Sequence, residues 1–506
     1  MLEAPSANTI EVVNPATLEK ICEVPIQTSA DVQAAYQRSR RAFQDWSQGN
    51  FEARAALMWR LRDYLLDHRD EVAEVICSET GKPKSEALLL EVTYICFAID
   101  FYAKHAKRFL RDRGAPLHWL LRHKKVFTAY HPVGAVGFIC PWNFPLTLTL
   151  GETIPALMAG NTVIIKPSEF TPRTAMLAAE ICEKVGFPAG VVQTVTGDGS
   201  TGAALIEAAD MISFTGSVAT GRRVLEAAAK RLIPVVLELG GKDPMVVLKD
   251  ADVERAANAA VWGAFANSGQ ICMSVERVYV EAPIAEAFTQ RVVEKTRKLR
   301  QGIDHDFSVD VGSMTMPRQL QIVERHVADA VRKGAIVLTG GRRNPNFKGL
   351  FYEPTVLDKV DHSMEIMTEE TFGPVLPIMR VCDENEALRL ANDSRYGLNS
   401  SIWSGDQRKG LALARRLQAG NVCVNDCMVN FVATGSPFGG IKESGLGHRH
   451  GEAGIRRYCT TQSVLVDKLG LTRELTWYPY SKKSARIMTR ALNFFFHSSL
   501  RKKLMG

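Results

Sequence analysis

The order of apolar and polar residues divides the chain into a helical N-terminal part and a longer part in which strands and helices alternate. Between about residues 29 and 105, apolar residues recur three and four positions apart, as in DVQAAYQRSRRAF, which predicts amphipathic helices. From residue 133 onward, short apolar runs and helical patterns follow one another every ten to fifteen residues or so. This alternation predicts a parallel, doubly wound sheet.

The first alternating stretch ends at the turn Gly240-Gly241. Its predicted strands are 133–140, 162–166, 191–195, a strand that ends at Phe214, and 235–239. Its predicted helices are 151–159, 173–186, 201–208 and one that begins at Ser217. The alternation then starts again with the run PMVVL, a helix over 252–267, the strand RVYVE and a helix over 284–300. A second α/β domain of about 200 residues is therefore expected.

The charge of the chain is concentrated at its C-terminus. The 506 residues suggest about three structural units and carry a formal net charge of +7. No acidic residue follows Glu474, whereas the basic residues beyond it are Lys482, Lys483, Arg486, Arg490, Arg501, Lys502 and Lys503. The rest of the chain is balanced and offers no broad basic surface, so we expect no nucleic-acid partner.

The C-terminal segment also has an apolar helical face, formed by Ile487, Ala491, Phe494 and Phe495. A basic amphipathic helix suggests peripheral contact with a membrane, and the same pattern equally fits a helix docked on the protein or on a neighbouring subunit. No apolar run approaches the ~20 residues that span a bilayer. The N-terminus MLEAPSANTIEVVNP lacks the apolar region of a secretory signal. We expect a cytoplasmic protein, either free or peripheral to the inner face of a membrane.

Two glycine-rich turns compete for the role of a phosphate-binding loop. Residues 197–202 match GxGxxG between a strand and a helix, but no acidic residue stands at the end of the next predicted strand, where Phe214 lies. The following turn contains Gly216 and Ser217 and also leads from a strand into a helix, whose first amides could hold a pyrophosphate. Taken alone, both sets of glycines are equally compatible with simple tight turns.

Three side chains are candidates for covalent chemistry. The ten cysteines include no CxxC pair, and Cys423 and Cys427 lack the partners of a metal site, so we expect reduced thiols and no metal. Cys272 follows a glycine in a loop, a position open to reaction, although any one of ten cysteines is first of all a small buried residue. Glu238 ends an apolar run, and burial would raise its pKa towards that of a general base. Asn143 sits between two prolines at a strand end, where its amide either enters a cleft or caps its own turn.

Seven ordered motifs of the chain resemble the aldehyde dehydrogenase superfamily, and locally a bacterial branch often labelled succinate-semialdehyde dehydrogenase. They are PWNFP at 141–145, KPSE at 166–169, FTGS at 214–217, LELGGK at 237–242, GQIC at 269–272, EETFGP at 369–374 and PFGG at 437–440. The spacing is also similar to that of the family, including the 34-position step from Glu238 to Cys272. The resemblance covers about residues 8–470.

The resemblance implies an α/β protein of the aldehyde dehydrogenase fold. It would have a Rossmann-like NAD-binding domain (1–112 and 133–240) and an α/β catalytic domain (241–445). Residues 113–132 and 455–470 would form a small oligomerisation segment, since Thr460–Val466 resembles the family's intersubunit strand, and a homodimer or homotetramer is expected. Residues 471–506 would be a basic amphipathic C-terminal extension beyond the family fold.

The resemblance also assigns roles to residues. Cys272 would attack the aldehyde carbon, Asn143 and the backbone N–H of Cys272 would stabilise the oxyanion, and Glu238 would activate the water that hydrolyses the thioester. The expected cofactor-binding residues are Pro141, Trp142, Lys166, Ser168, Glu169, Gly199, Phe214, Gly216, Ser217, Leu239, Glu370 and Phe372. Lys166 and Glu169 would hold the adenosine ribose, and Glu370 the nicotinamide ribose. The carboxylate of Glu169 would repel a 2′-phosphate, so NAD is expected as cofactor, with NADP as a second one.

The small-molecule substrate is expected to be an apolar aldehyde, aromatic or aliphatic. Succinate-semialdehyde enzymes hold the distal carboxylate with arginines, and the matching positions here carry Gly151 and Ala266. The apolar residues near the motifs are Phe144, Leu148, Trp262, Phe265, Met273 and Phe431, any one of which could be a plain core residue. Succinate semialdehyde is the alternative, with Arg277 as the source of positive charge. A catalytically silent nucleotide-binding relative is a more remote alternative, and a CoA-acylating reductase is opposed by Glu238.

Overall fold

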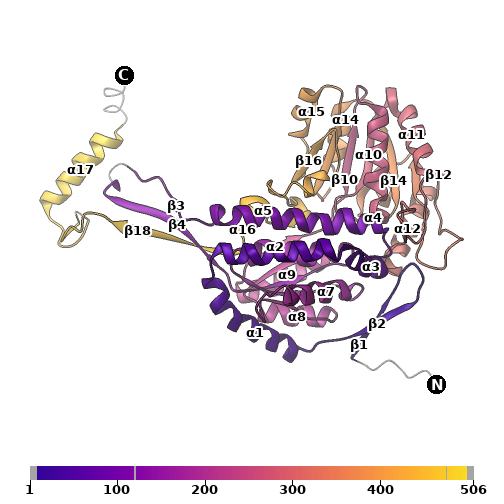
Figure 1. Cartoon of the computed structure of the whole chain (residues 1–506). Coiled ribbons are helices and arrows are strands. Elements are labelled where there is room, and N and C mark those ends of the chain that lie inside the picture. The colour runs from indigo at the N-terminus through magenta and orange to yellow at the C-terminus, as the bar shows by residue number, and fades with distance from the viewer. Residues whose placement is uncertain (1–7, 119–120, 475, 498–506) are drawn as a thin grey trace. The chain divides into compact units, whose positions relative to one another are not determined.

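The computed structural model describes residues 8–118, 121–474 and 476–497. Its backbone contacts divide the chain into a large unit, residues 1–111 with 130–460, and a small unit, residues 112–129 with 461–506. In its described residues, the large unit contains a six-stranded sheet, a seven-stranded sheet, a two-stranded hairpin and the helices that cover the two larger sheets (Figure 1). The last stretch of the predicted C-terminal extension, residues 498–506 with three of its basic side chains, lies outside the described residues.

The first sheet of the large unit has six strands in the order β17-β9-β8-β5-β6-β7. They are β5 (Ala135–Ile139), β6 (Thr162–Lys166), β7 (Val192–Thr194), β8 (Met211–Thr215), β9 (Val235–Glu238) and β17 (Gly445–Leu446). All pairs are parallel except β17 with β9. The chain runs outward from β5 to β7 and then returns to β8 and β9 on the other side of β5, so the prediction of a doubly wound sheet is confirmed.

Helices connect these strands, mostly where the apolar periodicity predicts them. They are η3 (Thr147–Gly151), α6 (Glu152–Met158), α7 (Pro172–Lys184), α8 (Gly199–Ala208) and α9 (Val218–Arg231). The helix predicted over 151–159 begins earlier, as a π-helical turn. Pro155 lies inside α6 and has no N–H to bond the carbonyl of Gly151, which loosens this start. β5 and β8 are neighbours in the sheet although they are not consecutive in the chain. The strand order reverses between them, and ligands of such sheets bind at this switch point.

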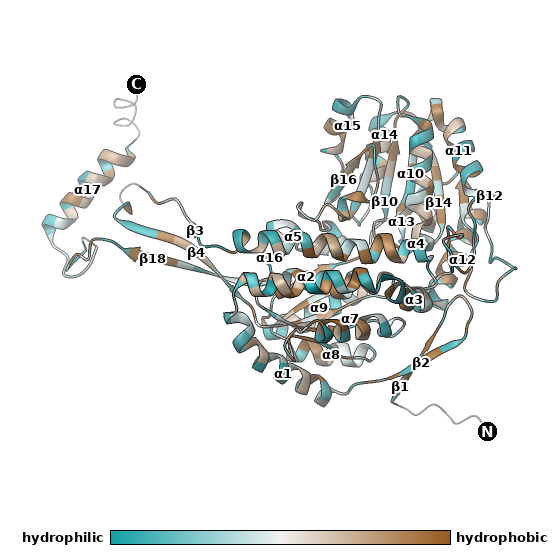
Figure 2. Ribbon diagram, in the orientation of Figure 1, coloured by the Kyte–Doolittle hydropathy of each residue, from teal (hydrophilic) through white to brown (hydrophobic). Residues whose placement is uncertain are grey.

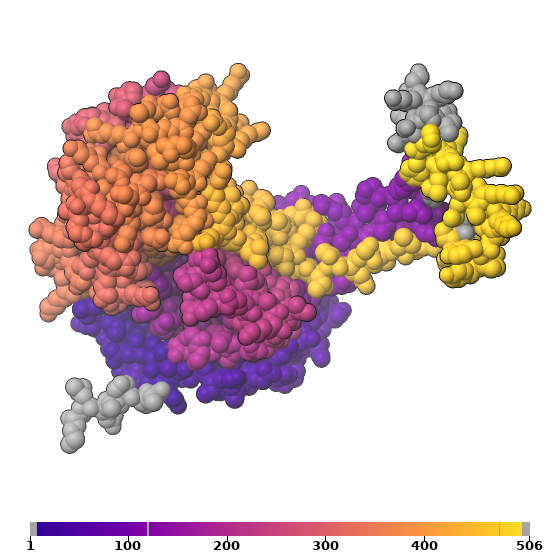
Figure 3. Space-filling view, turned by 180° about the vertical axis from the view of Figure 1, so that it is seen from behind, coloured from indigo at the N-terminus to yellow at the C-terminus, as the bar shows by residue number. Residues whose placement is uncertain are grey.

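The second sheet has seven strands in the order β12-β13-β14-β11-β10-β15-β16. They are β10 (Asp243–Val247), β11 (Val275–Glu281), β12 (Ile336–Thr339), β13 (Thr355–Asp358), β14 (Val375–Val381), β15 (Asn399–Trp403) and β16 (Asn421–Val424). Its helices are α10 (Val253–Phe265), α11 (Ala282–Thr296), α12 (Pro317–Arg332), α13 (Glu365–Thr368), α14 (Glu384–Asn392) and α15 (Gln407–Ala414). Seen from behind, the surface of the large unit passes from indigo N-terminal helices through magenta to the orange elements of this sheet (Figure 3).

The helix predicted over 252–267 ends at Phe265, and this difference matters for the site. Asn267 and Ser268 adopt left-handed conformations with φ of 49° and 54° inside the turn η4 (Ala266–Gly269). Non-glycine residues rarely take this conformation, and it breaks the helix just before Cys272. The chain therefore reaches Cys272 in a sharp turn between α10 and β11 rather than along a helix.

The N-terminal part of the large unit is helical, as predicted, and begins with a hairpin that the pattern does not reveal. The hairpin is β1 (Thr9–Val13) with β2 (Lys20–Pro25). The helices are α1 (Ser29–Gln48), α2 (Phe51–Asp67), α3 (Arg69–Thr80), α4 (Lys84–Glu86), the π-helical η1 (Ala87–Val92) and α5 (Thr93–Phe109). Apolar residues of α2, α5 and α6 pack with those of β5 and β6 in one buried cluster, so these helices form part of the core.

The described residues of the small unit form the helix α17 and most of a three-stranded sheet of order β18-β4-β3. Its elements are β3 (Arg113–Gly114), β4 (Lys124–Pro132), β18 (Cys459–Asp467) and α17 (Lys482–Phe496). Apolar and polar residues alternate along α17, as Figure 2 shows, in agreement with the predicted amphipathic helix. Among the described residues, no helix is both long enough and apolar enough to cross a bilayer.

Candidate active site

A cavity of about 710 Å³ opens at the carboxyl ends of the strands of the six-stranded sheet. Every residue named above as a catalytic or cofactor-binding candidate lines it. Those from the first sheet and its turns are Pro141, Trp142, Asn143, Lys166, Ser168, Glu169, Gly199, Phe214, Gly216, Ser217, Glu238 and Leu239, and those from the second are Cys272, Glu370 and Phe372. The structure thus gathers in one place residues that lie up to 231 positions apart in the chain, from Pro141 to Phe372.

One end of the cavity has the features of a phosphate-binding turn. β8 ends at Thr215, and Ser217 caps α9 by accepting a hydrogen bond from the backbone N–H of Thr220 at 3.3 Å. A Cβ on Gly216 would lie only 2.7 Å from the ring of Phe214, so a larger residue does not fit this turn. The first amides of α9 have no partners within the helix and can bind an anion.

The neighbouring wall offers both a donor and an acceptor. The Nζ atom of Lys166 lies 3.7 Å from a carboxylate oxygen of Glu169. Lys166 is buried, and this burial lowers its pKa, whereas Glu169 is partly exposed. A Cβ on Gly199 would meet no atom within 4 Å, which leaves open space beside α8. A cationic donor and a carboxylate beside an open, glycine-lined surface fit the diol and phosphates of the expected dinucleotide.

The opposite end of the cavity is built by the segment around Glu370. Its carboxylate accepts a hydrogen bond from the backbone N–H of Gly241 at 3.0 Å, and burial raises its pKa to about 8. Phe372 has a φ of 51°, and its ring packs nearly perpendicular to that of Trp142, with the ring centres 5.5 Å apart. Glu276 fixes this strained turn, since its carboxylate accepts from the backbone N–H of Phe372 at 2.8 Å. The indole of Trp142 and the phenyl ring of Phe372 therefore form an aromatic wall.

Glycines allow three of the motifs to come together by direct backbone contact. A Cβ on Gly241 would lie 2.5 Å from the carbonyl oxygen of Cys272. A Cβ on Gly269 would lie 2.2 Å from the carbonyl oxygen of Gly373, and φ of Gly269 is +71°. The turn after Glu238, the loop of Cys272 and the segment of Glu370 thus meet where no side chain larger than hydrogen fits.

Cys272 and Glu238 both face the cavity from buried surroundings. Burial raises the pKa of the Cys272 thiol to about 12, with further increases from the carboxylates of Asp243, Glu370 and Glu238. Burial likewise raises the pKa of Glu238 to about 7, and the positive charge of Arg449 opposes this rise. A carboxyl group with a pKa near neutrality can accept a proton, as a general base requires. The thiol must lose its proton before it can act as a nucleophile.

Asn143 does not cap its own turn, which was the alternative interpretation of its position. Its side-chain amide donates to the backbone carbonyl of Gln270 at 2.9 Å, in the loop that carries Cys272. In return, the side chain of Asn267 donates to the carbonyl of Asn143 at 2.9 Å. These two bonds tie the PWNFP turn to the cysteine loop. The Asn143 amide has two N–H groups, so the second can donate a hydrogen bond to a ligand in the cavity.

A buried ion pair between Lys82 and Glu91 holds the backbone of the PWNFP turn and was not predicted from the sequence. Lys82 donates to the carboxylate of Glu91 at 2.6 Å and to the carbonyl of Asn143 at 2.8 Å, and both side chains are fully buried. Its ammonium also lies 4.0 Å from the centre of the Phe144 ring. Glu91 accepts from the backbone N–H of Leu146 at 2.8 Å. The sequence signal was a single charge inside the apolar run 87–92, the same signal that identified Glu238.

The predicted apolar lining is only partly correct. Leu148 lines the cavity, and Phe144 and Phe431 pack, like Cys272, against the buried cluster that contains Phe265 and Met273. Trp262, however, is 42% exposed and is neither in this cluster nor in the wall of the cavity, because its position on α10 faces outward. A role of Trp262 in binding the substrate therefore stays a prediction.

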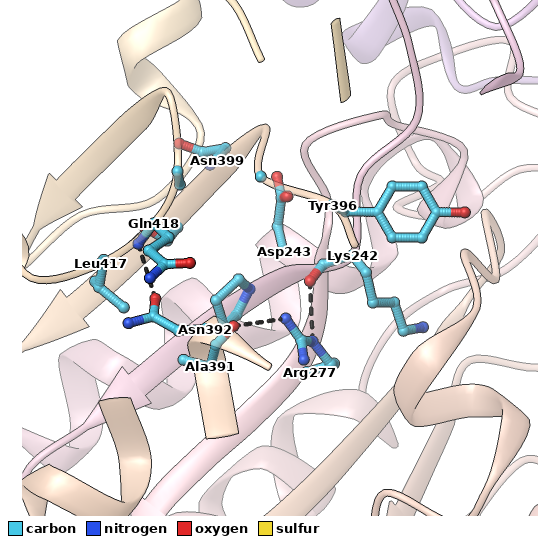
Figure 4. A pocket seen from close by; sticks show the side chains of 13 residues that line it. Lys242, Asp243, Arg277, Ala391, Asn392, Tyr396, Asn399, Leu417 and Gln418 are labelled. Carbon is cyan, nitrogen blue, oxygen red and sulfur yellow. Dashed lines mark hydrogen bonds between the residues drawn. The ribbon is translucent and has the colours of Figure 1, made fainter. Parts of the chain in front are cut away.

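Arg277 is not available to bind a substrate carboxylate. It is buried on β11, lines a different and very small cavity, and its guanidinium donates to the carbonyls of Lys242 at 2.9 Å and Ala391 at 3.1 Å (Figure 4). It also donates to the hydroxyl of Tyr279 at 3.0 Å. All three guanidinium nitrogens are thus occupied within the protein, and the positive charge that the alternative substrate would need does not come from this residue.

A doubly wound sheet with a cavity at its switch point, and a thiol and a carboxyl group at the inner end, is the arrangement of a nucleotide-dependent dehydrogenase. The model of the aldehyde dehydrogenase family matches residues 2–464, and the chain belongs to this family. It is accordingly an NAD(P)-dependent aldehyde dehydrogenase, which oxidises an aldehyde with reduction of the nicotinamide cofactor.

Comparisons with individual proteins agree with this family. The chain is 41% identical over 492 residues to a 4,4'-diapolycopene aldehyde oxidase from Methylomonas sp, covering 96% of this chain and 91% of the relative. It is 41% identical over 456 residues to a putative succinate-semialdehyde dehydrogenase [NADP(+)] 2 from Mycobacterium bovis, covering 90% and 88%. A solved betaine aldehyde dehydrogenase from Staphylococcus aureus in complex with NAD+ superposes with a TM-score of 0.86 at 32% identity, over 95% of each chain.

We predict that replacing Lys82 by Met destabilises the enzyme by about 3–5 kcal/mol, because Glu91 then remains as an unpaired buried charge. The free energy of unfolding, measured by urea denaturation, checks this. Lys84→Met is the matched control, since Lys84 pairs with the exposed Asp70 at 2.8 Å and its loss is expected to cost less than about 1 kcal/mol. Equal effects of the two substitutions would show that the buried pair does not support the turn.

Proposed function

We propose that this enzyme oxidises an apolar aldehyde, aromatic or aliphatic, to the carboxylic acid, with NAD as preferred cofactor, Cys272 as nucleophile and Glu238 as general base. The observation that carries the proposal is that the thiol, the carboxyl group and the Asn143 amide face one cavity. The rest of that cavity has the glycine turn, the ribose-binding pair and the aromatic wall that suit a dinucleotide.

The residues divide the reaction into two stages. The Cys272 thiolate attacks the aldehyde carbon, and the oxyanion that forms accepts hydrogen bonds from the Asn143 amide and the backbone N–H of Cys272. The bound cofactor supplies the hydride acceptor, and a thioester on Cys272 results. Glu238 then takes a proton from a water molecule, whose oxygen attacks the thioester carbon. The thiolate of Cys272 leaves as the acid forms, which restores the nucleophile.

Glu169 is the basis for the cofactor preference. Its partly exposed carboxylate lies beside Lys166 at the end of the cavity where an adenosine ribose would bind. A carboxylate accepts hydrogen bonds from two ribose hydroxyls but repels a 2′-phosphate. Related enzymes are named for NADP or solved with NAD+. We propose that this enzyme uses both and prefers NAD.

The surroundings of Cys272 support an apolar substrate. A Cβ on Gly151 would lie 2.9 Å from the ring of Tyr94, which fills the place where a carboxylate-binding arginine was considered. The carboxylate of Glu86 is half-buried next to the Cys272 loop, where it accepts from the backbone N–H of Asn267 at 2.9 Å. Because Glu86 would repel a second carboxylate, an aldehyde without charge is favoured.

The names of the relatives support both substrate classes. The Methylomonas protein is named as a 4,4'-diapolycopene aldehyde oxidase, and the mycobacterial proteins at the same identity are named for succinate semialdehyde. The occupied guanidinium of Arg277 and the Tyr94 ring beside Gly151 decide our choice between them. We therefore keep succinate semialdehyde as the second candidate and apolar aldehydes as the first.

We predict that decanal and benzaldehyde give at least about tenfold higher kcat/KM than succinate semialdehyde, since an unpaired carboxylate in this site costs more than about 1.4 kcal/mol. NADH formation, followed by absorbance, measures this. The methyl ester of succinate semialdehyde is a matched neutral control, because it differs from the acid mainly in charge. Cys272→Ala should lower the rate with every aldehyde by at least about 10⁴-fold.

Two outcomes would contradict this proposal in different ways. A higher kcat/KM for succinate semialdehyde than for its methyl ester would mean that a cation elsewhere in the site binds the carboxylate, and the apolar assignment would fall. Full activity of Cys272→Ala would instead contradict the role of Cys272 as the nucleophile. Neither result depends on the other.

We propose the domain functions on the same basis. Residues 1–112 with 133–240 would bind the cofactor, and residues 241–445 would carry the catalytic loop. Residues 113–132 with 455–470 would join subunits into a homodimer or homotetramer. β18 supports this last point, because it is the edge strand of its sheet, is nine residues long and is mostly exposed. A long exposed edge is suited to pairing with a second copy.

We propose in addition that the small unit contacts membranes through α17. Its exposed apolar residues are Ile487, Met488, Leu492, Phe494 and Phe496, and the aromatic residues Trp477, Tyr478 and Tyr480 are exposed just before it. Lys482, Lys483, Arg486 and Arg490 occupy the other side of the helix, and α17 contains no acidic residue. An apolar face with a cationic flank suits an anionic lipid surface. The alignment with the Methylomonas relative covers 96% of the chain and so reaches α17.

We predict that the full chain floats with vesicles containing about one-third anionic lipid and that deletion of residues 481–506 abolishes flotation. A second variant, Ile487→Ser with Phe494→Ser, should weaken flotation several-fold while the basic charge remains. Neutral vesicles are the control for the contribution of charge. Unchanged flotation of the deletion variant would refute the membrane contact, and a change in oligomeric state without loss of flotation would assign α17 to the subunit interface.

A further inference from the structure

Four charged side chains form a buried cluster beside the cavity: Glu152, Glu238, Arg449 and Arg457. Arg449 lies at its centre, with Nη1 at 3.0 Å from a carboxylate oxygen of Glu152 and Nε at 3.4 Å from Oε1 of Glu238. Nη2 of Arg457 approaches the same oxygen of Glu238 at 3.8 Å. The side chains of Arg449, Glu152 and Glu238 are at most 5% exposed, so water screens these charges very little.

The members of this four-charge cluster come from separate elements that meet only in the folded chain. Glu152 is the first residue of α6, and Glu238 is the last residue of β9. Arg449 and Arg457 flank the short helix α16 (Gly451–Arg456). Arg449 also donates to the hydroxyl of Thr215 at 2.5 Å, at the end of β8. Arg449 therefore connects α6 to the ends of the two strands that carry Glu238 and the phosphate-binding turn.

Arg449 and Arg457 lie within ion-pair distance of Glu238 but form no hydrogen bond with its Oε1 atom. Oε1 of Glu238, Nε of Arg449, and Nε and Nη2 of Arg457 are buried without a hydrogen-bond partner in the described structure. Buried polar atoms normally have partners, so this arrangement calls for a functional explanation. A cavity of about 10 Å³ beside Glu152, Arg449 and Arg457 is large enough for about one water molecule. Two guanidinium groups thus direct free N–H groups at one carboxylate oxygen.

We propose that Arg449 is a positioning residue which, together with Glu152, directs the carboxylate of Glu238 and keeps it charged for hydrolysis of the thioester. The inference rests on the proposed role of Glu238 as the base. Arg449 does not touch the reacting atoms itself; it acts through the carboxylate.

The charge balance of the cluster explains how it acts. With Glu238 ionised, two positive and two negative charges cancel; with Glu238 protonated, one positive charge remains buried and unbalanced, which is unfavourable. Burial raises the pKa of Glu238, Glu152 raises it further, and Arg449 and Arg457 oppose both effects. Arg449 faces Glu152, Glu238, Tyr94 and Cys272, and its charge also opposes the rise in the pKa of the thiol. The cluster thus favours the base form of Glu238 at neutral pH.

The experiment measures the rate of thioester hydrolysis directly as a function of pH. Enzyme with NAD and excess benzaldehyde is quenched at short times, and the acyl group on Cys272 is quantified by mass spectrometry. In Arg449→Met, the pH at which hydrolysis reaches half of its maximum should rise by at least one unit, with about a tenfold slower rate at pH 7 that recovers at higher pH. In Glu152→Gln the same midpoint should fall, because the positive charge near Glu238 is then in excess.

Two further variants separate charge from folding. Arg449→Lys retains the charge and should restore most of the midpoint, although with a lower maximum rate because a single ammonium replaces the planar guanidinium. Arg54→Met is the matched control, since Arg54 is also buried, donates to the carbonyls of Trp46 and Gly49, and lies in the cluster's own unit but away from the cavity. It should lower stability and leave the midpoint unchanged.

The outcomes distinguish this inference from the proposal on which it rests. If Arg449→Met and Glu152→Gln leave the midpoint unchanged or shift it in the same direction, Arg449 is merely structural and the inference is wrong. If Glu238→Gln hydrolyses the thioester at the rate of the unmodified enzyme, the base role itself is wrong. Should Arg449→Met fail to fold, Glu152→Gln still decides the question, because the inference predicts a fall in its midpoint and a merely structural role predicts none.

Discussion

The structure depends on charges that are held out of water and must be balanced there. Removing a carboxylate or an ammonium from water costs several kcal/mol unless an opposite charge and hydrogen bonds replace the lost hydration. This enzyme contains several such groups around one cavity: Lys82 with Glu91, Lys242 with Glu276, and Arg449 with Glu152 and Glu238. Lys242 with Glu276, and Arg449 with Glu152 and Glu238, join elements that are distant in the chain, and Lys82 also donates to the carbonyl of Asn143, 61 positions away, so the buried charges also determine where the loops of the site can lie.

The same constraint separates structural from reactive carboxylates. Glu276 is paired with Lys242 at 2.6 Å and holds two backbone amides of the Glu370 segment, so its hydrogen-bonding capacity is used. Glu238 has a buried oxygen without a hydrogen bond and a pKa of about 7. A fully paired carboxylate stabilises the fold, whereas an incompletely paired one that faces a cavity remains available to accept a proton. Glu238 lines the same cavity as Cys272, and in the proposed mechanism this proton acceptor activates the water that hydrolyses the thioester.

Much of this arrangement could be predicted from the sequence because its signals are local. Short apolar runs and helical patterns predicted the strands and helices of the first sheet, and a lone glutamate at the end of an apolar run indicated Glu238. The outward direction of Trp262 and the internal bonds of Arg277 depend on packing between distant elements, which no local pattern contains. The partners of Lys82 and Arg449 could not be identified for the same reason, although Glu91 and Glu152 are also isolated charges in apolar runs.

The central claim is that one cavity unites a thiol that forms the thioester and a carboxylate that hydrolyses it. The most direct test is the mass of Glu238→Gln after mixing with NAD and benzaldehyde. The account predicts a benzoyl group on Cys272 that accumulates to about one per active site, with about one NADH formed per site before turnover nearly stops. Steady turnover at the rate of the unmodified enzyme without this adduct, or an adduct on another residue, would contradict it.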